Sequence, residues 1–161
     1  MTPDAVEAVR QWLLPQVALI TPNLPEAAAL LGCPPASDEQ QMREQGRALL
    51  ALGCQGVLMK GGHLTGEDSP DWLFTAEGEQ RFVAQRVATR NTHGTGCTLS
   101  AALAALRPRY GHWGETVAVA KTICNVRWNR PIPWRWGRAS GLFIIFTNGG
   151  NENDENCRWV Y

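Results

Sequence analysis

The amino-acid sequence predicts an α/β fold in which helices cover both faces of a mostly parallel sheet. Two short, unbroken apolar runs, residues 17–20 and 56–59, are typical of strands that are buried on both faces. Segments with helix-capping residues precede, separate and follow these runs. The resulting order of helix, strand, helix, helix, strand implies right-handed crossovers and an α/β sandwich. The 161 residues are enough for one compact domain.

The first helices are predicted from their capping residues. Thr2 precedes Pro3, which suits the first position of a helix, and this helix should stop before Pro15. Asn23 follows the first strand and is expected to cap a short apolar helix that Gly32 closes. Both helices therefore begin at a side chain that can accept a backbone N–H bond.

The remaining elements continue the pattern. Ser37 and Gln40 form a candidate capping box for a helix over residues 38–52. An Ala- and Leu-rich helix is expected over residues 97–106, and another should begin at Gly114. Two further strands near a sheet edge are expected at 72–74 and 81–84.

Composition excludes several classes of protein. Lys plus Arg equals Asp plus Glu at 15 each, so charge gives no reason to expect a nucleic-acid or membrane partner. No apolar stretch reaches the length of a membrane span. The cysteines are odd in number, scattered and without a CxxC pair, which favours reduced thiols and a cytoplasmic location.

The segment Gly94-Thr95-Gly96 lies directly before a predicted helix and is the first candidate functional feature. Two glycines let the backbone turn sharply so that several N–H groups point at one place, and the helix dipole adds positive potential. Such a turn suits the charge on a transferred phosphoryl group. A plain glycine-containing helix entry is the commoner meaning of this spacing alone.

Cys97 follows in the first turn of the same helix. The helix N-terminus favours the thiolate form, so the side chain is a candidate base or nucleophile. A buried structural role is the commoner fate of a single cysteine. That role is expected for the other four cysteines: Cys33, Cys54, Cys124 and Cys157.

Two further candidate loops follow the predicted parallel strands. Asn23 and Glu26 are spaced so that a carboxylate lies one turn from the helix cap, where it can hold a hydrated magnesium ion; a simple helix cap is the alternative. Lys60 and Gly62 follow the second strand, where Lys60 can contact phosphates; a turn with a solvated lysine is the alternative. Parallel sheets bind ligands at the carboxyl ends of their strands, so both loops should meet there.

Three stretches in this order resemble the ribokinase-like superfamily, and more narrowly the bacterial hydroxymethylpyrimidine/phosphomethylpyrimidine kinases of thiamine biosynthesis. The matching stretches are Leu19–Ala27, Val57–His63 and Asn91–Ala102. The resemblance implies a ribokinase-like three-layer α/β/α sandwich. It implies ATP-dependent phosphorylation of 4-amino-5-hydroxymethyl-2-methylpyrimidine and then of its monophosphate, with ATP and Mg²⁺ as cofactors. Intact members are expected to be homo-oligomers.

The resemblance also implies roles for individual residues. Gly94, Thr95 and Gly96 would form the anion hole for the transferred phosphate, and Cys97 would take the proton of the substrate hydroxyl. The expected cofactor-binding residues are Asn23, Glu26, Lys60, Gly62, Thr92 and His93. Glu26 would hold Mg²⁺ through water.

The resemblance covers residues 1–121 and corresponds to the second half of the family's pattern, so the N-terminal half is expected to be missing. Residues 122–161 do not match in their own frame. Reading from the third base of each codon, starting at Lys121, permits Asp-Tyr-Leu-Gln-Arg-Ala-Leu-Glu-Ser-Ala-Asp-Thr-Leu-Ala-Val-Gly. It later permits Gly-Pro-Val-His-His-Phe-His-Gln-Trp-Trp and a stop, which resembles the family's ending.

We therefore expect two regions: a kinase-domain part over 1–121, and an out-of-frame tail over 122–161 that is irregular or disordered. A lineage-specific tail is the alternative. For function, three hypotheses follow: a pyrimidine kinase by family, a non-catalytic fragment of one, and a related vitamin kinase such as a pyridoxal kinase. The non-catalytic fragment is the expectation for this chain as written.

Overall fold

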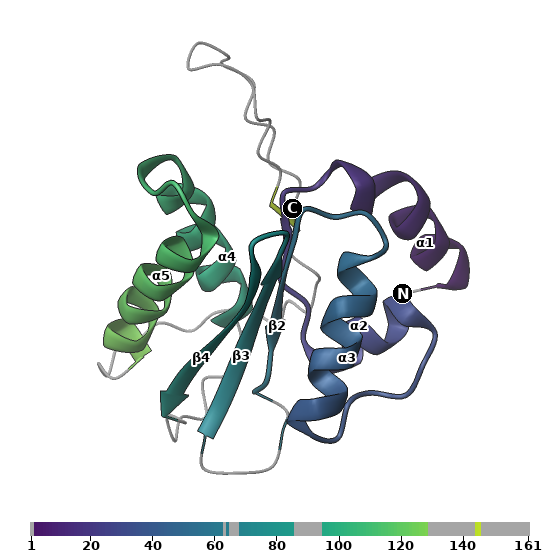
Figure 1. Ribbon diagram of the computed structural model, residues 1–161, viewed down its shortest axis with the longest axis horizontal. Helices are drawn as coiled ribbons and strands as arrows, with labels where there is room; N and C mark the ends of the chain where they lie inside the picture. The colour runs from purple at the N-terminus through teal and green to yellow at the C-terminus, as the bar shows by residue number, and fades with distance from the viewer. Residues whose placement is uncertain (1, 63, 65–67, 86–94, 129–143, 146–161) are drawn as a thin grey trace.

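A mixed five-stranded sheet lies between two layers of helices in the computed structural model of the protein (Figure 1). The structure describes residues 2–62, 64, 68–85, 95–128 and 144–145. Its helices are α1 Pro3–Ala8, α2 Leu24–Leu31, α3 Glu39–Leu50, α4 Thr95–Leu106 and α5 Trp113–Trp128. A π-helical turn, Val9–Leu13, and two 3₁₀ turns, Leu14–Gln16 and Arg107–Arg109, complete the helical segments. The strands are β1 Leu19–Ile20, β2 Gly56–Lys60, β3 Asp68–Thr75, β4 Gly78–Gln85 and β5 Ile144–Ile145.

The three-layer α/β class is confirmed, with α1, α2 and α3 on one side of the sheet and α4 and α5 on the other (Figure 1). The strand order is β4-β3-β2-β1-β5. Only β1 and β2 are parallel, with Ile20 opposite Val57. The prediction of a mostly parallel sheet is therefore wrong for the described strands. A tight turn joins β3 to β4, and the link from β2 to β3 is too short for a helical crossover, so both pairs are antiparallel.

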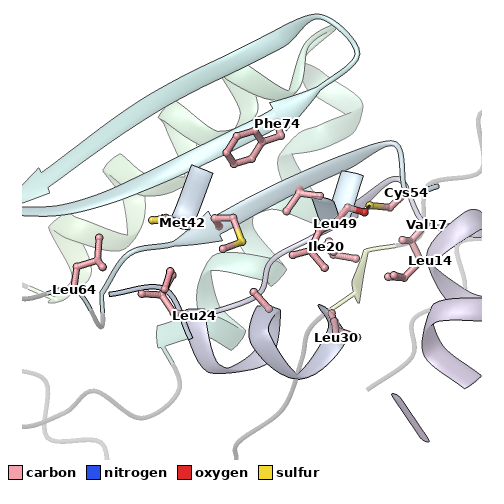
Figure 2. Close-up of a cluster of buried hydrophobic side chains, with 14 residues drawn as sticks. Leu14, Val17, Ile20, Leu24, Leu30, Met42, Leu49, Cys54, Leu64 and Phe74 are labelled. Atoms are coloured by element: carbon pink, nitrogen blue, oxygen red, sulfur yellow. Dashed lines mark hydrogen bonds between the residues drawn. The ribbon is translucent and has the colours of Figure 1, made fainter. Parts of the chain in front are cut away.

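The alternation of side chains explains why the central strands read as unbroken apolar runs. On β2, Val57 and Met59 belong to the core under α2 and α3, whereas Leu58 belongs to the core under α4 and α5. On β1, Ile20 and Leu19 divide in the same way. Each strand thus buries both faces, as expected for the middle of a three-layer sandwich. Figure 2 shows the first of these two cores.

The observed N-caps of α1 and α2 are the predicted residues, whereas the N-cap of α3 lies one residue later than predicted. Asn23 caps α2 through a complete capping box with Glu26, and Gly32 closes the helix in the left-handed conformation, φ 69°. The predicted box of Ser37 and Gln40 is wrong. Asp38 is the N-cap of α3, because its carboxylate accepts the Gln41 N–H at 2.8 Å.

The predicted boundary at Lys121 lies inside α5, which continues to Trp128. Residues 122–128 are thus helical rather than irregular, because Cys124 extends the buried stripe of Val117 and Ala120 into the core. Ile144–Ile145 forms β5, antiparallel to β1. The division of the chain at Lys121 itself stays a prediction. In the part of the chain that the structure describes, no helix is long and apolar enough to cross a membrane.

Candidate functional site

The two strand-end loops predicted from the sequence lie side by side. Because β1 and β2 are parallel, their carboxyl ends share one edge of the sheet. The Lys60 N–H donates to the Pro22 carbonyl at 2.9 Å, and Asn23 pairs with Lys60 in an isolated parallel bridge. The turn after β1 and the turn after β2 are therefore hydrogen-bonded neighbours.

The N-terminus of α4 completes this edge of the sheet. The Thr21 and Ser100 hydroxyls are 3.0 Å apart and buried, and they tie the end of β1 to the second turn of α4. Gly96 lies so close to Lys60 that a Cβ atom on Gly96 would be 3.1 Å from the Lys60 Nζ. Three segments far apart in sequence thus meet at one place.

The positive charges at this edge of the sheet favour the binding of an anion. The Lys60 ammonium lies against the first turn of α4, where unpaired N–H groups and the helix dipole also contribute positive potential. Within the described ranges, no carboxylate forms an ion pair with Lys60. Two positive groups side by side repel each other until a negative group binds between them. A phosphate matches this need because it offers several acceptor oxygens and negative charge.

Cys97 places a thiol at the same edge of the sheet, in the first turn of α4. It is the third residue of α4 and is half-buried. Its setting differs from that of Cys54 and Cys124, which are buried in the two cores, where burial raises the pKa of Cys54 to about 11 and also raises the pKa of Cys124. Those two residues have the structural role expected for them. Cys33 is exposed, so the expectation of burial was wrong there.

Asn23 and Glu26 have the local helix-capping role that was the alternative to a metal site. Glu26 Oε2 accepts the Asn23 N–H at 2.8 Å, and Asn23 Oδ1 accepts the Glu26 N–H at 2.8 Å. The other carboxylate oxygen, Glu26 Oε1, makes no hydrogen bond within the described part of the chain. One oxygen of the half-buried Glu26 carboxylate is thus available one helical turn from Asn23, the residue that bridges to Lys60.

Several predicted site residues lie outside the described residues, namely Thr92, His93 and Gly94. Thr95 is described as the first residue of α4. Gly62 lies in the turn after β2 and is exposed. The structure brings together Asn23, Glu26, Lys60, Gly96 and Cys97.

Sequence reasoning missed a buried ion pair beneath the site. Asp71 on β3 accepts the Gly61 N–H at 3.0 Å through Oδ1 and the Lys121 ammonium at 2.6 Å through Oδ2. The side chains of Asp71 and Lys121 are only 12% and 11% exposed. The one available signal was an aspartate inside a strand pattern, since Asp is depleted in strands and needs a reason to be there.

An open pocket lies elsewhere in the described part of the chain. It measures about 480 Å³ and lies between the β3–β4 turn and the start of α5, with Glu77, Gly78, His112 and Gly114 among its lining residues. Because Thr75 pairs with Gly56 and Asp71 pairs with Lys60, this cavity is at the opposite end of β2 from the candidate site. It contains none of the predicted site residues.

The described residues thus place a lysine, a helix N-terminus and a thiol at the carboxyl ends of two parallel strands in a three-layer α/β fold. The family model for phosphomethylpyrimidine kinase matches residues 1–137. The chain belongs to the phosphomethylpyrimidine kinase family.

Relatives and solved structures agree with this assignment. The hydroxymethylpyrimidine/phosphomethylpyrimidine kinase of Salmonella typhimurium is 72% identical over 121 residues, which are 75% of this chain and 46% of the relative. The ADP complex of Bacillus subtilis pyridoxal kinase has a TM-score of 0.70 and 35% identity, over 74% of this chain and 45% of that one. The phosphomethylpyrimidine kinase of Clostridium difficile 630 has a TM-score of 0.63 and 32% identity, over 78% and 49%. The chain thus spans about half the length of the curated relatives it matches.

Proposed function

We propose that this chain carries the phosphate-transfer side of a kinase that uses ATP to phosphorylate 4-amino-5-hydroxymethyl-2-methylpyrimidine, and then its monophosphate, in thiamine biosynthesis. The observation that carries the proposal is the Lys60 ammonium at the N-terminus of α4 without a carboxylate partner in the described ranges. The family supports a phosphotransfer reaction, and the ADP complex of a structural neighbour supports a nucleotide ligand. Cytoplasm is the proposed location, in line with the scattered cysteines of the sequence, which include no CxxC pair.

The chemistry assigned to the site is a direct phosphoryl transfer. The substrate hydroxyl oxygen attacks the γ-phosphorus of ATP, the bond from that phosphorus to the β–γ bridging oxygen breaks, and ADP leaves. The Cys97 thiolate takes the hydroxyl proton. Backbone N–H groups of the Gly94–Gly96 turn, with Lys60, stabilise the charge on the transferred group.

Magnesium is the proposed metal, and the residues present fit it. Mg²⁺ in phosphotransfer sites is held by one or two carboxylates together with phosphate oxygens and water. Glu26 Oε1 can supply one such contact, directly or through water, while Oε2 keeps its place in the helix cap. Once bound, the ion would neutralise charge on the ATP phosphates. No cage of three or more His, Cys, Asp or Glu residues exists among the described residues, and this mode of binding needs none.

A pyridoxal kinase is the second candidate, favoured by the TM-score of 0.70 to the Bacillus subtilis enzyme. The pyrimidine is preferred because the family model and the relative at 72% identity are both named for it.

The test measures phosphate transfer from ATP to hydroxymethylpyrimidine and, separately, to pyridoxal, with Cys97→Ala as the matched variant. Binding of the non-hydrolysable analogue AMP-PCP with Mg²⁺ is measured in parallel. Phosphate transfer to the pyrimidine that is lost in Cys97→Ala supports the proposal. Transfer to pyridoxal alone would show that the substrate is pyridoxal and not the pyrimidine. Nucleotide binding without transfer matches the expectation of a non-catalytic chain. A chain that binds no AMP-PCP would refute the phosphate site.

We also propose that a frameshift near Lys121 produced residues 122–161. The match to the Salmonella relative covers 121 residues, and the family model extends to residue 137. Genomic DNA across codon 121 decides the matter. A single-base insertion or deletion that restores the Gly-Pro-Val-His-His ending supports the frameshift, and a sequence in which no such change restores it contradicts it.

A further inference from the structure

We infer that Asp71, neutralised by Lys121, is the positioning residue that holds the Lys60-Gly61-Gly62 loop in place to receive phosphate. The inference rests on the proposed function, because it explains how the loop that carries Lys60 is fixed. Neither residue lies in a motif that the sequence analysis singled out. Both come from elements away from the loop, Asp71 from β3 and Lys121 from α5.

The contact is made at the backbone of the loop. Asp71 lies opposite Lys60 in the β2–β3 register, so its side chain can reach the residue that follows Lys60. Its Oδ1 accepts the Gly61 N–H at 3.0 Å in a buried hydrogen bond. Hydrogen bonds from backbone N–H groups to carboxylates are stronger than those between neutral groups. The direction in which the chain leaves β2 is therefore fixed immediately after Lys60.

Gly61 is held by further contacts on its other side. The Gly61 carbonyl accepts the Leu64 N–H at 2.9 Å, and Leu64 is only 8% exposed in the core that Figure 2 shows, at the same end as Leu24. A Cβ atom on Gly61 would lie 1.9 Å from the Pro70 carbonyl oxygen, so only glycine fits between β3 and the loop. Gly61 is thus fixed through its N–H, its C=O and its packing.

The positive charge of Lys121 compensates the negative charge of Asp71, which otherwise would oppose phosphate binding nearby. An unbalanced buried carboxylate would repel the phosphate that Lys60 attracts and would itself be costly to bury. The Lys121 ammonium, 2.6 Å from Asp71 Oδ2, cancels that charge and leaves Oδ1 free to accept from Gly61. Because Lys121 lies on α5, the pair also links the position of α5 to the loop.

The experiment uses the 161-residue chain and two readouts: amide hydrogen exchange at Gly61, and the Kd for Mg²⁺·AMP-PCP. The variants are Asp71→Ala, Asp71→Asn, Lys121→Met and Lys121→Arg. Cys124→Ala is the matched control, because it removes buried side-chain volume from α5 at a residue that is 0% exposed and has no hydrogen bond to the loop.

Loss of a hydrogen bond to a charged group should weaken AMP-PCP binding by about 10- to 100-fold in Asp71→Ala and speed Gly61 exchange by a similar factor. Asp71→Asn should recover much of both, since its amide oxygen still accepts. Lys121→Met should weaken binding, Lys121→Arg should recover part of it, and Cys124→Ala should change neither readout.

Unchanged Gly61 exchange in Asp71→Ala would overturn the inference. So would faster exchange with unchanged affinity, because the pair would then be only structural. If the wild-type chain binds no AMP-PCP, the proposed function fails instead, and the Gly61 exchange rates alone decide whether Asp71 holds the loop.

Discussion

Replacing Lys60 with methionine should stabilise the free protein and weaken phosphate binding at the same time. Methionine keeps an unbranched apolar stem of similar length and removes the charge. In the free protein, the ammonium lies against the N-terminus of α4, with a Cβ position on Gly96 only 3.1 Å from Nζ. The substitution therefore removes a repulsion when no ligand is bound and an attraction when phosphate is bound.

The size of the effect follows from that geometry. A helix N-terminus acts as about half a positive charge, and two unit charges about 4 Å apart near a protein surface interact by about 4 kcal/mol, which gives an upper limit of about 2 kcal/mol. Measured charge–dipole effects at exposed helix ends are about 0.3–1 kcal/mol. Since Lys60 is partly buried, we expect the free energy of unfolding to rise by about 0.5–1.5 kcal/mol. Loss of a charge-assisted phosphate contact should raise the Kd for AMP-PCP about 10- to 100-fold.

Urea unfolding gives the stability and calorimetric titration with Mg²⁺·AMP-PCP gives the affinity. Arg109→Met is the matched control, because it removes one positive charge from an exposed residue with no contact to the site. Arg109→Met should change neither the free energy of unfolding nor the Kd for AMP-PCP by more than the experimental error. A Lys60→Met protein that is less stable than wild type and binds AMP-PCP equally well would refute the inference that Lys60 is repelled by the helix N-terminus in the free protein and attracts a bound phosphate.

Three further predictions concern other parts of the structure. Iodoacetamide should modify both Cys33 and Cys97, and Mg²⁺·AMP-PCP should protect only Cys97; equal modification with and without nucleotide would place Cys97 away from the ligand. Gly46→Ala should lower the melting temperature despite its better helix propensity, because the new Cβ would lie 2.2 Å from the buried ring of Phe74 and overpacking costs about 1–3 kcal/mol; an unchanged or higher melting temperature counts against this packing. Hydrogen bonds from two arginines of α3 lower the pKa of Glu79 from 4.5 to about 2, so this carboxylate stabilises the fold above pH 4.5 and loses its effect as the pH falls toward 2. Glu79→Gln should then cost about 1 kcal/mol or less near neutral pH, since the pairs are partly exposed, and stability curves of the two proteins that run parallel from pH 5 to pH 2 would contradict this.

Local signals in the sequence were sufficient for most of the fold. The caps at Thr2 and Asn23 and the left-handed Gly32 follow from short-range hydrogen bonding and backbone freedom, which a sequence shows directly. The buried strands were also evident, because a strand covered on both faces has no polar side to interrupt its apolar run. The error at Ser37 arose because Asp38, Ser37 and their neighbours offer competing caps one residue apart.

The sheet direction and the deeper part of the site needed the structure. Apolar runs do not reveal whether neighbouring strands are parallel, whereas the short link between β2 and β3 leaves no room for the helical crossover that a parallel pair needs. The Asp71–Lys121 pair joins residues that are 50 positions apart, so no local spacing could reveal it. The meeting of Asn23 with Lys60 was predictable in outline because parallel strands end at one edge, whereas the approach of Lys60 to Gly96 depends on how α4 packs.

Phosphate is proposed to bind where the Lys60-Gly61-Gly62 loop meets the N-terminus of α4. The backbone amide signals of the glycines at this place test the proposal directly. Titration of isotopically labelled protein with Mg²⁺·AMP-PCP should shift the amide signals of Gly61, Gly62 and Gly96 in the nuclear magnetic resonance spectrum. The amides of Gly78 and Gly114, which line the cavity at the opposite end of β2, should stay in place. Shifts confined to Gly78 and Gly114, or no shift at Gly96 at saturating nucleotide, would contradict the account.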